Sequence, residues 1–451
     1  MFETLKNAFK VKEIRHKIYW TLLFLLLYRI GCYIPVPGVG TTLLDESDLG
    51  SASYLNIMSM MTGGSLQNGT LFAMGIGPYI NASIIMQLLA VAIPPLERLS
   101  KQGEEGRKKI AQYTRYLTII LAIIQSVGII LSYGKDSIIH GSENYPSLSA
   151  ILAGGKDATN GFTDAMSYII VVLFFTAGTC ITMWIGERIT EHGVSNGISL
   201  LIFAGIIASA GIFTVNQIRT IFGGDFERVQ LLRFLGYVLI IVVVFGLIVW
   251  VELAERKISV QYAKQVKGRK MYGGQSTVIP IKVNANGVMP LIFAFSIMTF
   301  PELIMTLIGA TGALGWWSKW LGSTSQYPFY AIVLALLIIF FAFFYSQIQF
   351  NPEDISKTIQ QNGGFIPGIR PGKPTADYLK KISNRLTLFG AIFLALLALI
   401  PTIVLNFILP GSGSSGAFSA TGMLIAVSVA LEFNTALESQ IMMKNYKGFL
   451  K

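Results

Sequence analysis

The chain has 451 residues, of which 53% are hydrophobic and only 13% charged, with a formal net charge of +11 and a mean hydropathy of +0.59. Soluble globular chains carry about 25% charged residues, and soluble monomers avoid large exposed apolar patches. This composition excludes ordinary soluble enzymes, nucleic-acid modules and disordered scaffolds. It predicts an integral membrane protein.

Apolar stretches of about 17 to 25 residues have the length of a helix that crosses a bilayer. The sequence contains ten of them. In chain order they are 18–34, 71–93, 113–133, 165–186, 195–215, 231–251, 288–308, 329–350, 386–408 and 421–441. A short amphipathic piece at 53–61 precedes the second stretch and is too brief to span the membrane.

Basic residues are distributed unequally between alternate connections. The N-terminal arm, the even-numbered loops and the C-terminal tail hold 28 of the 35 Lys and Arg residues, whereas the odd-numbered loops hold six. The remaining one, Arg29, lies within the first span. By the positive-inside rule, both termini face the cytoplasm. Topology and anionic lipid head groups account for the basic charge, so we expect no sequence-specific nucleic-acid partner.

Two cytoplasmic loops, 252–287 and 351–385, exceed the 12–15 residues beyond which an unstructured loop is usually functional or disordered. The first is basic, and the second contains the Gly- and Pro-rich run NGGFIPGIRPGKP at 362–374. Gly and Pro at this density predict an ordered, turn-rich tip. A solvated loop whose charges only report topology is one interpretation. We favour a docking platform for a cytoplasmic partner.

The span interiors contain almost no ionisable residues, which are the usual marks of proton relays and substrate sites in transporters. No nucleophile arrangement, nucleotide-binding motif or metal-ligand cluster stands out, so we predict no enzyme, no cofactor and no metal. Ile76, Ile80 and Ile84 recur every four residues in the second span, beside Pro78. Isoleucines at this spacing share one helix face and usually pack or face lipid, but a pore lining is the alternative.

Several ordered segments resemble the SecY family of protein-translocation channels. TLFAMGIGPYINASIIMQLL at 70–89 and WIGERITEHGVSNGISLLI at 184–202 are similar to the two family signatures. Further similar segments follow the family's order. They are RIGCYIPVPG at 29–38, GEEGRKKIAQYTRY at 103–116, RKISVQYAK at 256–264, KVNANGVMPLIF at 282–293 and the long segment at 351–378.

This resemblance implies an all-α membrane fold of ten helices in two inverted, pseudo-symmetric halves, with a short plug helix. The family's constriction, or pore ring, carries over to Ile76, Ile80, Ile198, Ile202, Ile292 and Ile425. The short piece at about 54–68 matches the plug, with Leu55, Met58, Met61, Gly63 and Gly64 as its residues. From the sequence alone, an interfacial helix on the outer leaflet is the alternative.

The resemblance also implies a lateral gate between spans two and three on one side and spans seven and eight on the other. Its positions carry over to Ser83, Ile84, Gln125, Asn284 and Phe300, whereas Asn286 stands where the family leads us to expect Ala. Arg370 matches the family's arginine that contacts the SecA motor and the ribosome, and Arg256 and Lys257 belong to the other docking loop. Implied partners are SecE and SecG subunits, SecA, the ribosome, unfolded preproteins with signal sequences, and membrane lipids.

The sequence thus predicts a protein-conducting channel of the cytoplasmic (inner) membrane that passes unfolded chains outward and releases apolar segments sideways into lipid. A secondary transporter for a small solute is the alternative, and a membrane-embedded enzyme a third. The expected organisation is an N-terminal arm at 1–17, a first half at 18–217, a second half at 218–441 and a tail at 442–451.

Overall fold

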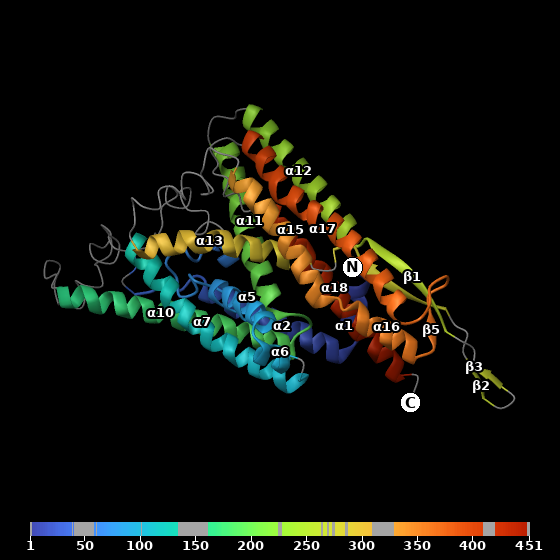
Figure 1. Cartoon of the computed structure of the whole chain (residues 1–451). Helices are drawn as coiled ribbons and strands as arrows, with labels where there is room; N and C mark the ends of the chain where they lie inside the picture. The colour runs from blue at the N-terminus through green and yellow to red at the C-terminus, as the bar shows by residue number, and fades with distance from the viewer. Residues whose placement is uncertain are drawn as a thin grey trace. The chain divides into compact units, whose positions relative to one another are not determined.

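The computed structural model describes residues 2–37, 39, 58–59, 61–100, 102–133, 161–223, 228–262, 265–267, 270–272, 276–284, 287–308, 329–408 and 420–448. Helices predominate among them (Figure 1). The chain forms two compact units. Unit 1 comprises Met1–Phe234, Ser296–Tyr330 and Leu409–Lys451, and unit 2 comprises Leu235–Phe295 and Ala331–Ile408.

Unit 1 is a helical bundle. Within it α7 packs on α5, α10 on α7, and α11 on both α10 and α18, while α2 packs on α10 and α11. Its helices are α1 (Phe2–Lys10), α2 (Lys12–Gly31), α5 (Gly77–Ala92), α6 (Pro94–Ser100), α7 (Glu104–Tyr133), α10 (Gly161–His192), α11 (Gly197–Gly223) and α18 (Ala420–Gly448).

The cytoplasmic arm predicted at 1–17 contains an amphipathic helix, α1, that packs on α18 and α2. Ala8 and Leu437 are fully enclosed in a small apolar cluster at this junction. Thr4 Oγ1 donates to Glu438 Oε1 at 3.2 Å, and Gln440 Nε2 donates to the carbonyl oxygen of Val194 at 3.0 Å. The two ends of unit 1 are therefore joined by both apolar packing and hydrogen bonds.

A helix occupies each of the ten predicted spans. Among the described residues, six helices are long and apolar enough to cross a membrane, or seven if the bent pair α5 and α6 counts as one span. The axes of α5 and α6 differ by 106°. This mainly helical, multi-span architecture confirms the predicted fold class.

The second predicted span differs from expectation at its start. Residues 71–76 form turns, Gly75 has φ +50°, and α5 begins only at Gly77 with Pro78 in its first turn. Proline suits the first turn of a helix because its missing N–H would have no partner there. The Gly and Pro residues therefore start the helix later than hydropathy alone indicates.

Unit 2 joins membrane helices to a small sheet. A three-stranded antiparallel sheet has the order β4-β1-β5, and β2 pairs with β3. The elements are the greater part of α12 (Arg228–Glu252), β1 (Glu255–Tyr262), β2 (Gln265–Lys267), β3 (Lys270–Tyr272), β4 (Ser276–Lys282), the first residues of α13 (Met289–Ile308), α15 (Phe329–Gln349), α16 (Pro352–Gln361), β5 (Gly364–Phe365) and α17 (Lys373–Ile408). These strands are absent from the all-α prediction.

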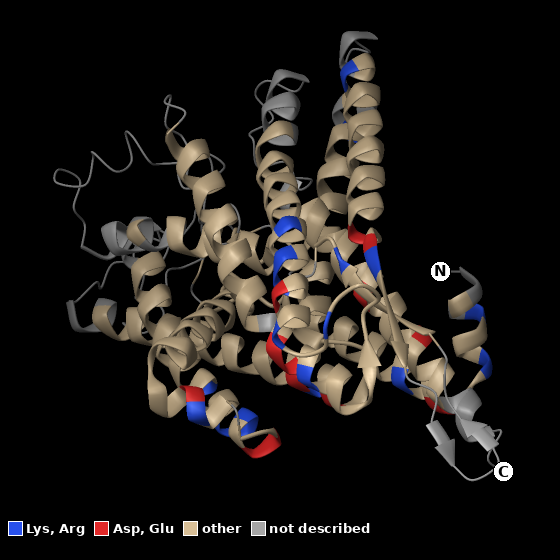
Figure 2. Ribbon diagram, turned by 45° about the vertical axis from the view of Figure 1, so that its right-hand side comes forward, with Lys and Arg blue, Asp and Glu red and all other residues tan. Residues whose placement is uncertain are grey.

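Charged residues concentrate at helix ends and in the strands and loops, whereas long helical stretches have none (Figure 2). α15 carries no Asp, Glu, Lys or Arg over Phe329–Gln349. Its apolar side chains pack through aromatic contacts instead, with the ring of Phe293 edge-on to those of Phe341 and Tyr345. The separation of charge from apolar helix is what a bilayer requires.

Candidate functional site

The start of α5 holds two of the predicted pore-ring residues. Ile76 is the residue before the helix, with 6% of its surface exposed, and Ile80 lies half-buried one turn later. The amide of Ile80 donates to the carbonyl oxygen of Ile76 at 3.1 Å. The late start of α5 therefore places these two isoleucines at a helix N-terminus rather than in the middle of a span.

The start of α11 holds two more, Ile198 and Ile202, and polar caps fix its position. Asn196 Oδ1 accepts from the amide of Ile198 at 3.1 Å, which is the bond an N-cap residue makes. The amide of Gly197 donates to Thr190 Oγ1 at 2.9 Å, which ties α11 to the end of α10. A Cβ at Gly197 would overlap a carbonyl oxygen of α10, so only glycine permits this approach.

Ile425 and Ile292 complete the predicted set. Ile425 lies on α18, is 4% exposed, and belongs to a helix that packs on α11. Ile292 lies in α13 within unit 2 and is half-buried. The structure thus brings the helices of five of the six isoleucines into unit 1. The ring as a whole stays a prediction.

The predicted plug is described from residue 58, and Leu55 lies outside the described residues. We call residues 58–59 and 61–69 the plug segment. It is buried inside unit 1: Met58 is 4% and Leu66 0% exposed, and both join an apolar cluster with side chains from α7 and α10. The Met61 side chain is half-buried.

Close approaches hold the plug segment against α5 and α11. A Cβ added to Gly205 of α11 would overlap the carbonyl oxygen of Met61. A Cβ at Gly77 would lie 3.3 Å from the terminal methyl group of Met58. Gly205 lies three residues after Ile202, and Gly77 lies one residue after Ile76. The plug segment therefore contacts the two helices that begin with four of the predicted ring residues.

The predicted lateral-gate residues divide between the two units. In unit 1, Ser83 accepts a hydrogen bond from Gln87 Nε2 at 3.3 Å, and Ile84 is 4% exposed on the same helix. Gln125 on α7 is 1% exposed, and its Oε1 has no hydrogen-bond partner among the described residues. In unit 2, Asn284 Nδ2 donates to Glu252 Oε1 at 2.8 Å. Phe300 lies in the later part of α13, which belongs to unit 1.

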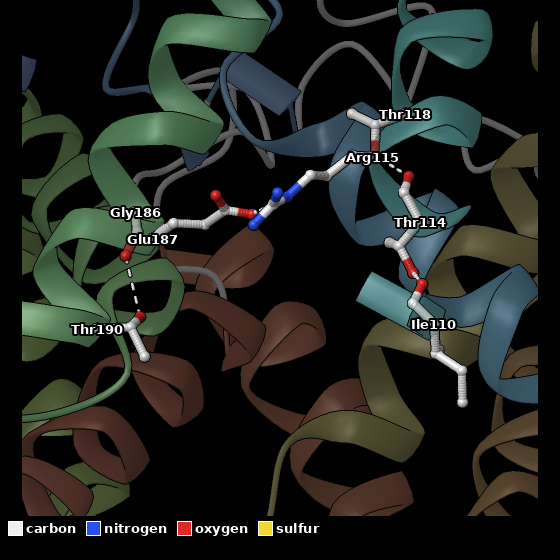
Figure 3. A network of polar contacts seen from close by, with 7 residues as sticks. All are labelled: Ile110, Thr114, Arg115, Thr118, Gly186, Glu187 and Thr190. Carbon is white, nitrogen blue, oxygen red and sulfur yellow. Dashed lines mark hydrogen bonds and ion pairs between the residues drawn. The ribbon is translucent and has the colours of Figure 1, made fainter. Parts of the chain in front are cut away.

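An ion pair that the sequence analysis missed joins α7 to α10 (Figure 3). Arg115 Nε lies 2.7 Å from Glu187 Oε1, with both side chains partly exposed. Thr114 and Thr118 on α7, and Thr190 on α10, donate their hydroxyls back to carbonyl oxygens of their own helices at 2.7–2.9 Å. Because 72 residues separate the pair, no local spacing pattern could have indicated it.

The two predicted docking loops meet in one sheet. Strands β1 and β4 of the first loop pair from Glu255↔Lys282 to Gln261↔Ser276, and β5 of the second loop pairs with β1 at Gln261↔Phe365. An apolar cluster lies between the sheet and the helices α16 and α17. Its buried members are Ile258, Val260, Ile281, Ile359, Ile366 and Leu379.

The three predicted docking residues are exposed on this framework. Arg256 and Lys257 lie on β1, and Lys257 Nζ is 3.2 Å from Glu255 Oε1. Arg370 is exposed in the tip, while its carbonyl oxygen accepts from Thr375 Oγ1 at 2.9 Å. This bond, with that from Ser356 Oγ to the carbonyl oxygen of Gly372 at 2.7 Å, orders the Gly- and Pro-rich tip. The predicted ordered tip is confirmed.

Sequence comparison identifies the family. The SecY family model matches residues 70–434. The chain belongs to the SecY family. It is 40% identical over 460 residues to the protein translocase subunit SecY of Streptomyces galbus, and 42% identical over 455 residues to that of Bacillus licheniformis, with 100% of both chains covered in each comparison.

Solved structures agree on the fold. A structure described as that of a protein conducting channel matches with a TM-score of 0.66 at 22% identity, over 94% of this chain and 92% of that one. Sec61 in the canine ribosome-channel complex from the endoplasmic reticulum matches with a TM-score of 0.61 at 20% identity, with the same coverage. These findings confirm the prediction of a multi-pass protein-translocation channel and do not support a small-solute transporter.

Proposed function

We propose that the chain passes unfolded preproteins with signal sequences outward across the cytoplasmic membrane and releases apolar segments sideways into lipid. The observation that best supports this function is the burial of the plug segment, which is too short to span a bilayer and yet is buried inside unit 1 beside α5 and α11. An interfacial helix would leave its polar face to solvent and its apolar face to lipid. Burial of Met58 and Leu66 supports a plug instead.

The pathway is a constriction of six isoleucines, Ile76, Ile80, Ile198, Ile202, Ile292 and Ile425. A narrow apolar ring excludes water and ions by dewetting when empty. Its side chains can also change rotamer around a passing chain without binding it tightly. Such a lining suits a substrate of no fixed sequence, and it requires no catalytic group, cofactor or metal. Among the described residues, no group of three or more His, Cys, Asp and Glu could hold a metal ion.

The sheet that joins both cytoplasmic loops is the docking surface for the SecA motor or a translating ribosome. Arg256, Lys257 and Arg370 project from a framework whose apolar side is buried, so their backbone positions are fixed before a partner binds. Preorganised contact residues lose less conformational entropy on association. From the resemblance to the family, we further propose SecE and SecG as the membrane partners. We also propose that both termini of the chain face the cytoplasm.

The proposed lateral gate takes Ser83, Ile84 and Gln125 from α5 and α7, which pack together, and adds Asn284 and Phe300 from the seventh span and the turn before it. The Oε1 of Gln125, which has no hydrogen-bond partner in the part of the chain that the structure describes, supports this role. A buried polar atom without a partner raises the free energy of the packed state. A seam with such an atom is easier to part than a fully satisfied apolar seam.

Site-specific crosslinking tests the pathway. A photo-crosslinking residue at Ile80 in the reconstituted channel should give an adduct with a stalled preprotein. The same residue at Ile207, which is 50% exposed on α11, should give lipid adducts only. Preprotein adducts at Ile207 but not at Ile80 would overturn the assignment of the pathway. Adducts at neither position would remove the channel proposal for this chain.

A further inference from the structure

Arg29, in the last turn of α2, contacts the plug segment. Its Nη1 donates to the carbonyl oxygen of Gly63 at 3.4 Å. Its Nη2 donates to the hydroxyl of Tyr33 at 3.0 Å, and its guanidinium carbon lies 4.8 Å from the centre of the Tyr33 ring. The same side chain therefore holds a plug carbonyl on one side and is itself oriented by an aromatic residue on the other.

The backbone of the plug segment presents this carbonyl by means of two glycines. Gly63 has φ +69° and Gly64 φ +85°, and the amide of Gly64 donates to the carbonyl oxygen of Ser59 at 2.9 Å. This is the bond pattern that ends a helix in a Schellman motif, which requires a left-handed residue and favours glycine. The helical turn thus stops at Gly63.

Gly63 is needed for a second reason. A Cβ at this position would lie 2.5 Å from Nη1 of Arg29, 3.3 Å from the carbonyl oxygen of Gly205 and 3.4 Å from Cβ of Ala208, the last two on α11. By contrast, a Cβ at Gly64 would meet nothing within 4 Å. Both neighbouring glycines have a positive φ, but of the two only Gly63 makes room for the arginine.

The plug segment has a fixed end and an end that depends on Arg29. Its C-terminal end is anchored to the backbone that follows α2, because the amide of Leu71 donates to the carbonyl oxygen of Ile34 at 2.8 Å and that of Val36 to Gly69 at 3.2 Å. Among the described residues, the side-chain hydrogen bond that reaches the turn at 58–64 from outside the segment is that of Arg29. The other hydrogen bonds of this turn among the described residues lie within the plug segment, such as those that Thr62 Oγ1 and the amide of Gly64 donate to the carbonyl oxygen of Ser59.

We propose that Arg29 is the positioning residue of the plug, which it fastens through the carbonyl oxygen of Gly63, with Tyr33 holding the guanidinium in place. The inference rests on the plug role proposed above. An arginine stays charged at any physiological pH, and its planar fork can serve Tyr33 and Gly63 at once, which an ammonium group does less well. The long 3.4 Å contact can be broken when the plug moves and remade when it returns.

Ion leak through vesicles containing the full channel complex measures how well the plug is seated. We expect Arg29→Ala to raise the leak about tenfold, equivalent to about 1.4 kcal/mol in the seating equilibrium. Arg29→Lys should give a smaller increase, and Tyr33→Phe, which keeps the ring and removes the hydroxyl, a smaller one again. Equal leak in all three variants and the native chain would overturn the proposal.

The glycine pair supplies the matched control. Gly63→Ala should raise the leak as Arg29→Ala does, whereas Gly64→Ala, which also places a side chain at a positive φ, should raise it much less. In the Arg29→Ala background, Gly63→Ala should add only slightly more than Gly64→Ala, because the arginine it displaces is already gone and the 3.3 Å approach to the carbonyl oxygen of Gly205 is the tightest contact left. A full additional effect of Gly63→Ala in that background would show that the arginine contact is not what matters.

Deletion of residues 58–64 separates this inference from the plug function itself. If the deletion raises the leak and Arg29→Ala does not, the plug role stands and the arginine contact falls. If the deletion leaves the leak unchanged, the plug role falls as well. Thermal unfolding of each purified complex in detergent shows that the variants fold. Should Arg29→Ala fail to fold, the milder Tyr33→Phe and the glycine pair still decide the matter.

Discussion

Removing the buried side chain of Leu379 should loosen the sheet of β4, β1 and β5, which we call the docking sheet because we propose that partners bind there. The change leaves its exposed basic residues in place. Leu379 is 0% exposed at the base of the sheet, in contact with the cluster that includes Ile258 and Ile366. Leu→Ala replacements at enclosed sites cost about 2–5 kcal/mol, because the cavity collapses only partly. We take about 3 kcal/mol, which increases the open population of the sheet about a hundredfold.

Limited trypsin digestion reports this opening. Lys257 pairs with Pro280 within the β1–β4 ladder, so cleavage after it requires the strands to separate. When opening and closing are fast, the cleavage rate follows the open population. Leu379→Ala should therefore speed cleavage after Lys257 by about two orders of magnitude. Leu388→Ala, on the same helix but 47% exposed, is the matched control and should change it little.

Two results would refute this reasoning. Equal cleavage rates in Leu379→Ala and Leu388→Ala would show that the apolar cluster does not hold the sheet. Faster cleavage after Lys108 of α7 in the Leu379→Ala variant would show that the substitution destabilises unit 1 as well, and hence that the effect is not local. Motor-driven translocation should fall along with the protection of Lys257, since the docking residues would lose their fixed positions.

Three further predictions concern single contacts. Arg370→Glu should abolish most motor-driven translocation but leave thermal unfolding unchanged, because the hydrogen bond from Thr375 uses the Arg370 backbone and not its side chain. Lys108→Glu, also at an exposed position, is the control, and normal translocation in Arg370→Glu would contradict docking at this residue. Ile425→Asn should raise ion leak several-fold by hydrating the constriction, whereas Met442→Asn, at a residue 62% exposed on the same helix, should not. Equal leak in the two variants would show that Ile425 is not part of the ring. For Arg115 and Glu187, each single charge reversal should lower the unfolding temperature and the double reversal should restore it. The coupling free energy between the two residues should be about 0.5–1 kcal/mol, and additive effects would show that the two charges do not interact.

Hydropathy predicted the helices well, and its errors have physical causes. A window of apolar residues predicts α12 and α15 because nothing in them interrupts the helix. The same window misplaces the start of α5, where Gly75 adopts a positive φ that ends regular structure. It also ends α10 too early, since the helix continues to His192 through charged residues that hydropathy rejects.

The docking sheet was missed although its signal was present. Ile258 and Val260 alternate with polar residues in β1, and this two-residue period is typical of a half-buried strand. The prediction of a rigid, turn-rich tip drew on Gly and Pro alone. Pairing of β5 with β1 joins segments about a hundred residues apart, and such partners cannot be read from local periodicity.

Arg29 shows what composition cannot say about a charge in a span. Counted with the other basic residues, it was the one that did not fit the topology, because it lies within an apolar helix near the end opposite the basic arm. In the structure its guanidinium donates to the carbonyl oxygen of Gly63 and lies over the ring of Tyr33. Both groups attract a cation, but neither carries a negative charge. A carboxylate partner would form a tighter pair that resists separation. A plug must seal and then leave, so a cation that meets a neutral carbonyl is better suited to the role than an ion pair.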